Sequence, residues 1–219
     1  MLIKLCGMMC EADVRAALSV RPDYIGFILC DRFRRYISPD DVLRIRKKIG
    51  WSYDLTANPA DRHTEYMGEK TKAVGVFVDQ DPDKIIHLLD TGVIDVAQLH
   101  GDEPDEHIIK IKDQTGKPVI KAFRIENEED VIRAEASPAD MILLDAGTGA
   151  GETFDWSLVQ NVSRDFFLAG GLNPDNIVAA IEQVHPYGVD VSSGIETDGK
   201  KDPKKMKLFT ERINLYNAK

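Results

Sequence analysis

The sequence of 219 residues has few of the features that mark secreted, metal-binding or membrane proteins. Its cysteines number three and form no CxxC pair, which disfavours a disulfide framework and a structural zinc site. No apolar run approaches the roughly 18 residues of a membrane-spanning helix, and the first residues lack the apolar core of a signal peptide. We therefore expect a cytoplasmic protein with no membrane partner and no metal site.

Basic charge is also scarce, because 28 Lys and Arg residues stand against 37 Asp and Glu residues, a net charge of −9. A nucleic-acid partner requires a basic face, so we expect none. A local anion pocket is still compatible with this balance, since backbone N–H groups and one or two cations can build it. The apolar fraction of 43% and the length allow a complete hydrophobic core.

Eight short apolar runs, which predict strands, alternate with eight amphipathic stretches, which predict helices. The predicted strands are Leu2–Cys6, Tyr24–Leu29, Ala73–Val78, Asp95–Leu99, Val119–Phe123, Met141–Asp145, Phe166–Ala169 and Val189–Ser192. The predicted helices begin near Glu11, Pro39, Pro82, Pro104, Asn127, Asp155, Pro174 and Pro203. Proline suits the first helical turn, and an N-cap residue precedes it in Ser38-Pro39, Asp81-Pro82, Asn173-Pro174 and Asp202-Pro203.

Eight βα units are compatible with a closed barrel or with an open, doubly wound sheet. Polar residues and glycines at the ends of six predicted strands favour the barrel. These residues are Cys6, His100, Arg124, Asp145, Gly170-Gly171 and Ser192-Ser193. An open sheet gathers its site at one switch point, whereas a barrel brings all of its strand ends around one pocket. We predict the α/β class and a single (β/α)8 TIM barrel over residues 1–219.

One segment, at about residues 50–72, is longer than most loops in compact domains. It follows a helix and precedes a strand, so a barrel places it on the face opposite the site. We interpret it as a surface excursion or a short extra helix. The alternative is an oligomer contact through aromatic residues such as Trp51, and both a monomer and a homodimer fit the sequence.

Cys6 and Asp145 are candidates for acid–base chemistry. Strand alternation places Lys4 and Cys6 on one face, where the ammonium group would lower the pKa of the thiol. The alternative is that Cys6 is simply a small buried apolar residue. Asp145 closes an apolar run, so its carboxyl group either faces a site or caps the following turn.

His100 and Arg35 are candidates for binding. His100 ends a predicted strand and is either catalytic or a hydrogen-bonded core histidine. Arg35 is one of three arginines that follow the second predicted strand. One of them would clamp a carboxylate with its planar fork, unless all three are solvated. The lysine-rich stretch at residues 200–205 is expected to be the solvated start of the last helix.

Two loops after the last two predicted strands carry Gly170-Gly171 and Ser192-Ser193. Barrels often bind a phosphate at this place through the N–H groups of loops and helix N-termini. The alternative is that these residues only form turns. A further glycine-rich loop at residues 147–151, with Gly149 and Gly151, matches neither GxGxxG nor a P-loop.

Nine segments, taken together and in order, make the chain resemble the phosphoribosylanthranilate isomerase family. They are Lys4-Leu5-Cys6-Gly7, Gly26-Phe27 with Arg35-Tyr36, Val74-Gly75-Val76-Phe77-Val78, Gln98-Leu99-His100-Gly101, Leu143-Leu144-Asp145, Phe154-Asp155-Trp156, Leu168-Ala169-Gly170-Gly171-Leu172-Asn173-Pro174, Val189-Asp190-Val191-Ser192-Ser193-Gly194-Ile195-Glu196 and Gly199-Lys200-Lys201-Asp202.

The resemblance implies a (β/α)8 barrel that uses no cofactor or metal and acts on a phosphorylated small molecule. Its reaction is an Amadori rearrangement of N-(5'-phosphoribosyl)anthranilate to a 1-deoxyribulose 5-phosphate in tryptophan biosynthesis. By this resemblance Asp145 is the general acid, Cys6 is the general base and Arg35 holds the anthranilate carboxylate. The other substrate-binding residues are then Lys4, His100, Gly149, Gly151, Gly170, Gly171, Ser192 and Ser193.

One window, Thr148–Glu152, departs from the family pattern by a replaced glycine and a missing hydroxyl group. A carboxylate at Glu152 would weaken substrate binding if it pointed inward. The alternatives are a related sugar-phosphate barrel, such as a histidine-pathway isomerase or indoleglycerol-phosphate synthase, and a non-catalytic sugar-phosphate-binding barrel. The histidine-pathway enzyme needs an aspartate where this chain has Cys6, the synthase needs lysines and glutamates absent from matching strand ends, and only the altered window favours a binding protein.

Overall fold

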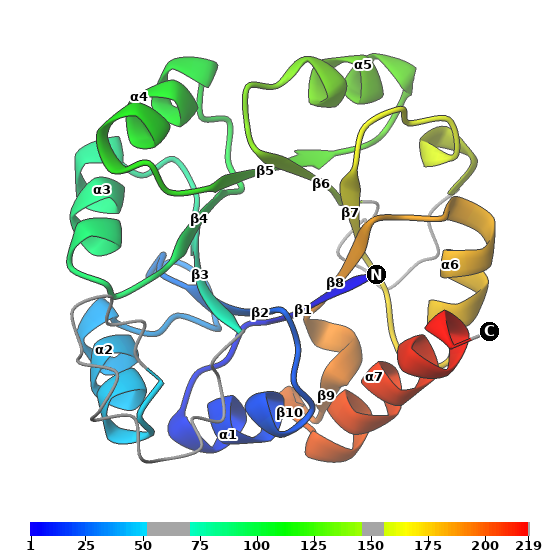
Figure 1. Cartoon of the computed structure of the whole chain (residues 1–219), viewed down its shortest axis with the longest axis horizontal. Helices are drawn as coiled ribbons and strands as arrows, with labels where there is room; N and C mark the ends of the chain where they lie inside the picture. Colours follow the sequence, from blue (N-terminus) through cyan, green and yellow to red (C-terminus); the bar gives the residue numbers. More distant parts are fainter. Residues whose placement is uncertain (52–70, 146–155, 219) are drawn as a thin grey trace.

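The computed structural model describes residues 1–51, 71–145 and 156–218. Eight parallel strands close into a barrel in chain order (Figure 1). They are β1 (Leu2–Cys6), β2 (Tyr24–Ile28), β3 (Lys72–Phe77), β4 (Val96–Leu99), β5 (Val119–Arg124), β6 (Met141–Asp145), β7 (Phe166–Ala169) and β8 (Gly188–Val191). The helices outside them are α1 (Glu11–Ser19), α2 (Pro39–Lys48), α3 (Pro82–Asp90), α4 (Asp105–Thr115), α5 (Glu128–Ala136), α6 (Ile177–Val184) and α7 (Pro203–Asn217).

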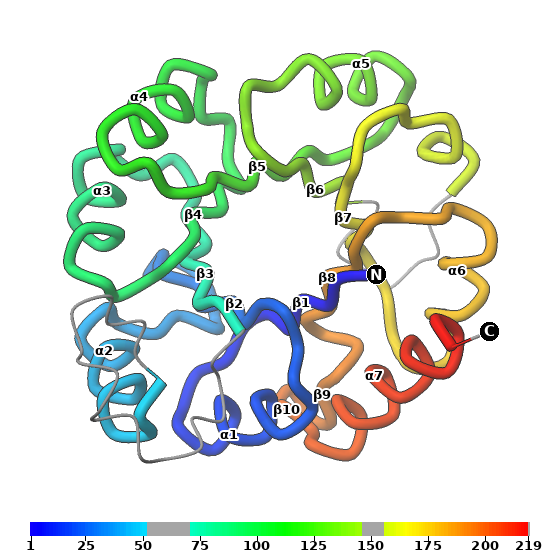
Figure 2. Tube along the Cα trace, in the orientation of Figure 1, coloured from blue at the N-terminus to red at the C-terminus, as the bar shows by residue number. Residues whose placement is uncertain are grey.

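The chain passes once around the barrel, so the first and last barrel strands, β1 and β8, lie side by side (Figure 2). In the register that closes the barrel, Leu2 pairs with Gly188 and Lys4 pairs with Asp190. The predicted (β/α)8 barrel is therefore confirmed, and each predicted strand matches an observed one to within one residue at either end. Within the described ranges, no helix is long and apolar enough to cross a membrane.

Two of the predicted helices differ from the structure. Near Asp155, the described residues contain only the 3-10 helix η2 (Trp156–Val159), which ends in a turn at residues 160–161, and Ser163 then donates two hydrogen bonds to the Glu135 carboxylate. Helix α6 begins later than Pro174, because the Asn173 side chain caps a turn rather than the helix. The other three predicted N-caps are confirmed, at Ser38, Asp81 and Asp202.

Two apolar clusters form the core. The larger one lies between the barrel and its helices, and it includes Ile3 and Leu5 from β1. The smaller one lies inside the barrel and consists of Tyr24, Val74, Val96, Ile120, Ala122, Leu143, Phe167 and Ala169. Because side chains alternate along a strand, Lys4 and Cys6 share the inner face of β1, as predicted.

The segment predicted to be an excursion begins and ends in described residues, although residues 52–70 lie outside them. Trp51 is only 4% exposed, and its indole Nε1 donates a hydrogen bond of 2.9 Å to the Thr71 carbonyl oxygen. The Arg46 guanidinium group lies over the indole ring, 5.1 Å from its centroid. Trp51 is therefore a core residue and is not available for the alternative oligomer contact, and the other aromatic residues of the segment lie outside the described residues.

A small hairpin that the sequence analysis did not predict follows β8. It comprises the 3-10 helix η3 (Ser193–Ile195), β9 (Glu196–Thr197) and β10 (Lys200–Lys201), with Lys201 paired to Glu196 in antiparallel register. The hairpin takes the place of the expected solvated stretch before α7. It buries Lys201, which is 8% exposed, while Lys200 stays exposed, so the expectation for Lys201 is wrong.

Candidate active site

A cavity of about 360 Å³ opens at the carboxyl ends of the barrel strands. Eight predicted site residues line it: Cys6, Arg35, His100, Asp145, Gly170, Gly171, Ser192 and Ser193. Lys4 lies buried behind this lining, at 0% exposure, and Gly149, Gly151 and the window Thr148–Glu152 lie outside the described residues. Arg124, also noted at a strand end, is exposed, pairs with Glu126 and is not part of the lining.

Cys6 lies at the end of β1 next to a buried ion pair. The Lys4 ammonium group lies 3.0 Å from Asp190 Oδ1, a residue of β8 that also lines the cavity. Burial lowers the pKa of Lys4, but attraction to Asp190 and Cys6 outweighs burial and raises it overall. Burial raises the pKa of the Cys6 thiol, and Lys4 opposes this in the predicted direction without overcoming it.

Asp145 and His100 approach each other across the cavity wall. The His100 Nε2 atom lies 3.3 Å from Asp145 Oδ2, and His100 Nδ1 lies 3.3 Å from the amide nitrogen of Gln98. If that amide donates to Nδ1, the imidazole proton is on Nε2 and points to the Asp145 carboxylate. In this arrangement Gln98 and Asp145 contact opposite nitrogen atoms of the His100 ring, so the imidazole group connects the inner wall of the cavity to the carboxyl group at the end of β6.

Gln98 carries a second feature that sequence reasoning missed. Its side-chain oxygen is buried and has no hydrogen-bond partner among the described residues, although the residue lines the cavity. A buried acceptor without a donor is costly, so this oxygen is suited to a donor on a ligand. The signal was present in the sequence, because Gln98 is a polar residue on the same alternation as His100.

The two loops that carry the predicted phosphate ligands pack directly on each other. Gly170 and Gly171 have φ angles of +92° and +62°, which favour glycine. A Cβ atom on Gly194 would lie 1.8 Å from the Leu172 carbonyl oxygen, so the loop after β8 requires glycine there. The structure thus brings together the glycine pair and Ser192-Ser193, which the sequence separates by about twenty residues.

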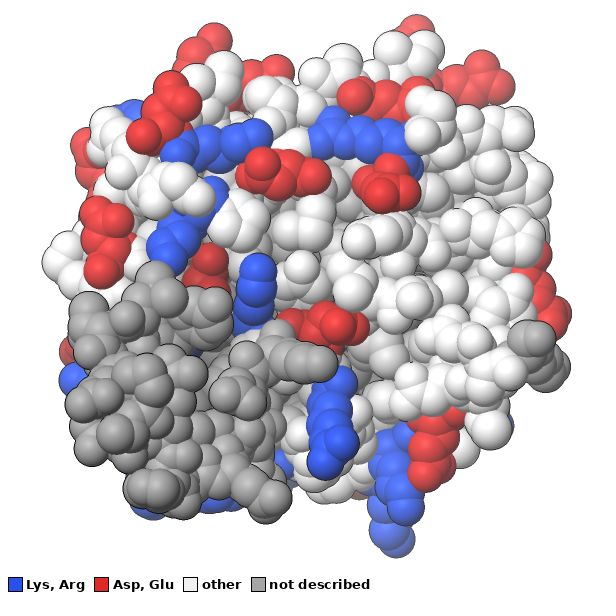
Figure 3. All heavy atoms as spheres, in the orientation of Figure 1, with Lys and Arg blue, Asp and Glu red and all other residues white. Residues whose placement is uncertain are grey.

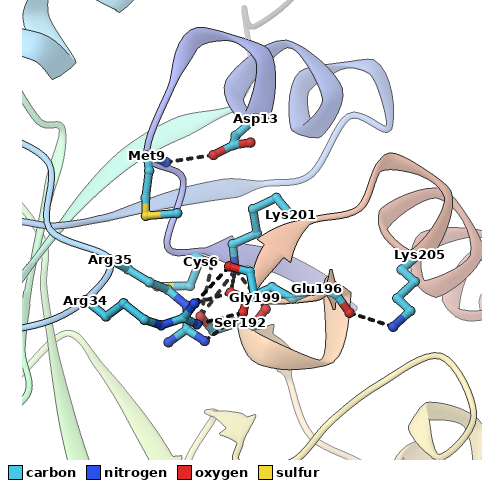
Figure 4. A network of polar contacts seen from close by, with 10 residues as sticks. All are labelled: Cys6, Met9, Asp13, Arg34, Arg35, Ser192, Glu196, Gly199, Lys201 and Lys205. Carbon is cyan, nitrogen blue, oxygen red and sulfur yellow. Dashed lines mark hydrogen bonds and ion pairs between the residues drawn. The ribbon is translucent and has the colours of Figure 1, made fainter.

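Arg35 lies at the mouth of the cavity and is held by Glu196 (Figure 4). Its Nε and Nη2 atoms donate hydrogen bonds of 2.5 and 3.0 Å to the two carboxylate oxygens of Glu196. Lys201 also approaches this carboxylate, with Nζ 2.9 Å from Oε1. Burial raises the pKa of Glu196, but Arg35 and Lys201 outweigh burial and lower it from 4.5 to about 2.

The same carboxylate also binds Arg34, whose Nη2 atom donates to Glu196 Oε2 at 3.0 Å. Arg34 Nη1 donates to the Gly199 carbonyl oxygen, which fixes the turn of the hairpin. The loop after β2 and the hairpin after β8 are therefore connected beside β1. Sequence reasoning missed Glu196 and Lys201 as site residues, because their burial depends on a hairpin whose two strands have only two residues each.

Comparisons of the sequence with known proteins identify one family. A family model for N-(5'-phosphoribosyl)anthranilate isomerase matches residues 52–212. The enzyme of that name from Endomicrobium trichonymphae is 37% identical over 209 residues, which cover 93% of this chain and 94% of the relative. The chain is also similar to the enzyme from Thermoanaerobacter sp. (strain X514), at 34% identity and with coverage of 96% and 97%.

Solved structures give the same result. A phosphoribosylanthranilate isomerase from Thermotoga maritima superposes with a TM-score of 0.80 at 36% identity, covering 98% of each chain. Another crystal structure, in complex with reduced 1-(o-carboxyphenylamino)-1-deoxyribulose 5-phosphate, gives a TM-score of 0.78 at 35% identity, with 98% of each chain covered. The chain therefore belongs to the N-(5'-phosphoribosyl)anthranilate isomerase family.

Proposed function

We propose that this protein isomerises N-(5'-phosphoribosyl)anthranilate to 1-(2-carboxyphenylamino)-1-deoxyribulose 5-phosphate, with Asp145 as general acid and Cys6 as general base. One observation carries the proposal. A thiol and a carboxyl group from separate strands line the same cavity, together with a guanidinium group and two glycine- and serine-containing loops. This arrangement matches a reaction that moves protons on a substrate with a carboxylate at one end and a phosphate at the other.

The chemistry follows as two proton transfers. Asp145 donates a proton to the furanose ring oxygen, the C1'–O bond breaks, and the nitrogen lone pair forms an iminium ion. The Cys6 thiolate then removes the proton from C2', and the electrons of that bond neutralise the iminium nitrogen. The resulting enolamine tautomerises to the ketone. Because burial raises the pKa of the Cys6 thiol, the neighbouring Lys4 ammonium group matters for the thiolate form.

Binding of the substrate is assigned to three groups of residues. Arg35 takes the anthranilate carboxylate, since guanidinium forks suit planar anions. Gly170-Gly171 and Ser192-Ser193 take the phosphate through the loops after β7 and β8. His100 lies beside the proposed acid, and the unpartnered oxygen of Gln98 is suited to a hydroxyl or N–H group of the substrate.

The related-barrel and binding-protein alternatives are not favoured by the family match. A nucleic-acid partner is also not expected, and acidic and basic side chains are interspersed on the face shown in Figure 3. We further propose a cytoplasmic location and a monomer or homodimer, with the description of one solved relative from Thermotoga maritima as dimeric in support of the latter.

The first experiment is an anthranilate fluorescence assay. The unstable substrate is generated from anthranilate and phosphoribosyl pyrophosphate by a transferase, and this protein is then added. Isomerisation should consume the substrate before it reverts to fluorescent anthranilate. Cys6→Ala and Asp145→Ala should each lower kcat by about 10²–10⁴-fold, the usual contribution of a general acid or base.

Circular dichroism and thermal unfolding of both variants provide the control. Retained structure with lost turnover supports the two roles. Turnover that survives in either variant would contradict the assignment of that residue. A folded wild-type protein that binds the product but does not turn over the substrate would favour the binding-protein alternative.

A further inference from the structure

Glu196 joins two cations, Arg35 and Lys201, close to the proposed base (Figure 4). Its side chain is only 7% exposed, and each of its oxygens accepts from Arg35. Lys201 approaches Oε1 of the same carboxylate at 2.9 Å. A nearly buried carboxylate between a binding cation and a cation beside the thiol differs from a surface ion pair, because the lower local dielectric strengthens both interactions.

The first of the two cations, Arg35, is oriented by this contact. Glu196 occupies the side edge of the guanidinium group, formed by Nε and Nη2. Among the described residues, Nη1 of Arg35 has no hydrogen-bond partner, and Arg35 lines the cavity. A guanidinium group has five N–H donors in a fixed plane, so holding one edge leaves the other edge for a ligand carboxylate.

The second cation, Lys201, lies next to Cys6. Its side chain is 0% exposed, and Nζ donates a hydrogen bond of 2.8 Å to the Ser192 carbonyl oxygen. The Ser192 hydroxyl group in turn donates to the Cys6 carbonyl oxygen at 3.2 Å. A Cβ atom on Gly7, the residue after Cys6, would lie 3.4 Å from Lys201 Nζ.

Three charged groups face the Cys6 thiol, from three different strands. Lys4 of β1 and Lys201 of β10 favour the thiolate, and Asp190 of β8 disfavours it. Asp190 is bound to Lys4 and partly cancels that cation. Burial lowers the pKa of Lys201, while Glu196 acts against this, so Glu196 helps to keep the second cation protonated.

We propose that Glu196 is a positioning residue with two roles. It directs the free edge of Arg35 to the substrate carboxylate, and it holds the Lys201 ammonium group beside Cys6. The role of Glu196 in turnover rests on the proposed function. Its electrostatic part concerns the ionisation of Cys6 and can be measured in the absence of substrate.

Three variants separate the two parts. Glu196→Gln removes the charge at nearly constant size. Glu196→Asp keeps the negative charge that helps to keep Lys201 protonated, but its shorter side chain cannot keep both hydrogen bonds to Arg35. Lys201→Gln removes the second cation beside Cys6 and keeps the Glu196 carboxylate that binds Arg35. Glu211→Gln, in the exposed Lys207–Glu211 pair of α7, is the matched control for loss of a paired carboxylate.

Two readouts are compared for each variant. The first is the KM and kcat of the isomerase reaction across pH. The second is the rate at which iodoacetamide alkylates Cys6 as a function of pH, measured by fragment-ion mass spectrometry that assigns each adduct to Cys6, Cys10 or Cys30 separately. The alkylation rate reports the thiolate fraction and requires no turnover.

We expect Glu196→Gln to raise KM at least about tenfold, as for loss of a charged hydrogen bond, and to move the Cys6 alkylation profile to higher pH. Glu196→Asp should raise KM while the alkylation profile stays near wild type. Lys201→Gln should move the profile with little change in KM, and Glu211→Gln should alter neither readout.

The inference is overturned if Glu196→Gln lowers only the melting temperature and leaves KM and the Cys6 profile unchanged, since that is a purely structural role. It is also overturned if the profile moves to lower pH, because Lys201 would then not depend on Glu196. A wild-type protein without isomerase activity would instead refute the proposed function, while the alkylation profiles would still test the link between Glu196 and Cys6.

Discussion

Gly26 of β2 makes room for the proposed base. It pairs with Cys6 in the register of the first two strands, and a Cβ atom there would lie 2.6 Å from the Cys6 sulfur. The same atom would lie 3.1 Å from Lys4 Nζ. The absence of a side chain at this position therefore lets the thiol and the ammonium group share the inner face of the barrel wall.

We predict that Gly26→Ala displaces the Cys6 sulfur and lowers kcat. A displacement of about 1 Å in a reacting group can cost on the order of 100-fold in rate, and we expect a loss of that order. Steady-state kinetics by the fluorescence assay would measure it. An unchanged kcat would show that the thiol adapts without loss or is not the base.

Gly75→Ala is the matched control for this substitution. Gly75 lies in the neighbouring strand β3, and a Cβ atom there would meet the side chains of Ile94 and Phe77 at 2.8–2.9 Å, away from the cavity lining. This variant should lower the melting temperature while kcat stays near wild type. A comparable loss of kcat in both variants would point to general distortion of the barrel wall.

At the scale of elements, another buried ion pair, Lys121–Glu103, ties the loops after β3 and β4 to β5. Lys121 of β5 lies 2.7 Å from Glu103, and both side chains are at most 6% exposed. Glu103 accepts hydrogen bonds from the backbone N–H groups of Asp79 and Gly101. Since Gly101 directly follows His100, this pair holds the loop that places the imidazole group near Asp145.

Glu103→Gln should be strongly destabilising, because it leaves the Lys121 charge buried beside a neutral partner. Breaking a buried ion pair on one side typically costs about 3–5 kcal/mol in free energy of unfolding. Glu126→Gln breaks the exposed Arg124–Glu126 pair at the end of the same strand and should cost less than about 1 kcal/mol. Urea unfolding of the two variants tests this difference, and equal costs would refute it.

At the scale of the whole molecule, acid should weaken the fold through the cluster around Glu196. Its pKa in the folded protein is about 2, below the ordinary 4.5. The carboxylate therefore contributes its full stabilisation above about pH 4.5, and this contribution is lost as the pH falls from 4.5 toward 2. Asp79 and Asp202 act in the same direction, because hydrogen bonds lower their pKa values as well.

We predict that the melting temperature of the wild-type protein falls between pH 4.5 and pH 2, and that Glu196→Gln makes this fall shallower. The physical reason is that the variant has no carboxylate to protonate at this position. Scanning calorimetry in buffers across that range measures the slopes, with Glu211→Gln as the reference. Parallel slopes in all three proteins would show that Glu196 is not coupled to folding.

Local patterns in the sequence were sufficient to predict most of the architecture. The apolar runs and the N-caps at Ser38, Asp81 and Asp202 indicated the strands and several helix starts, because strand alternation and capping involve residues close in sequence. Cys6 and Asp145 could be selected for the same reason, since each ends an apolar strand. The parallel order then placed both at one end of the barrel.

The pairing of charges across the barrel could not be predicted in this way. Lys4 and Asp190 are separated by 186 residues, and they meet only because β1 and β8 close the barrel in one register. Arg35 and Glu196 likewise meet through a hairpin too short to leave a sequence signal. Sequence periodicity determines which face a side chain occupies, whereas its partner depends on closure, and closure is a property of the whole fold.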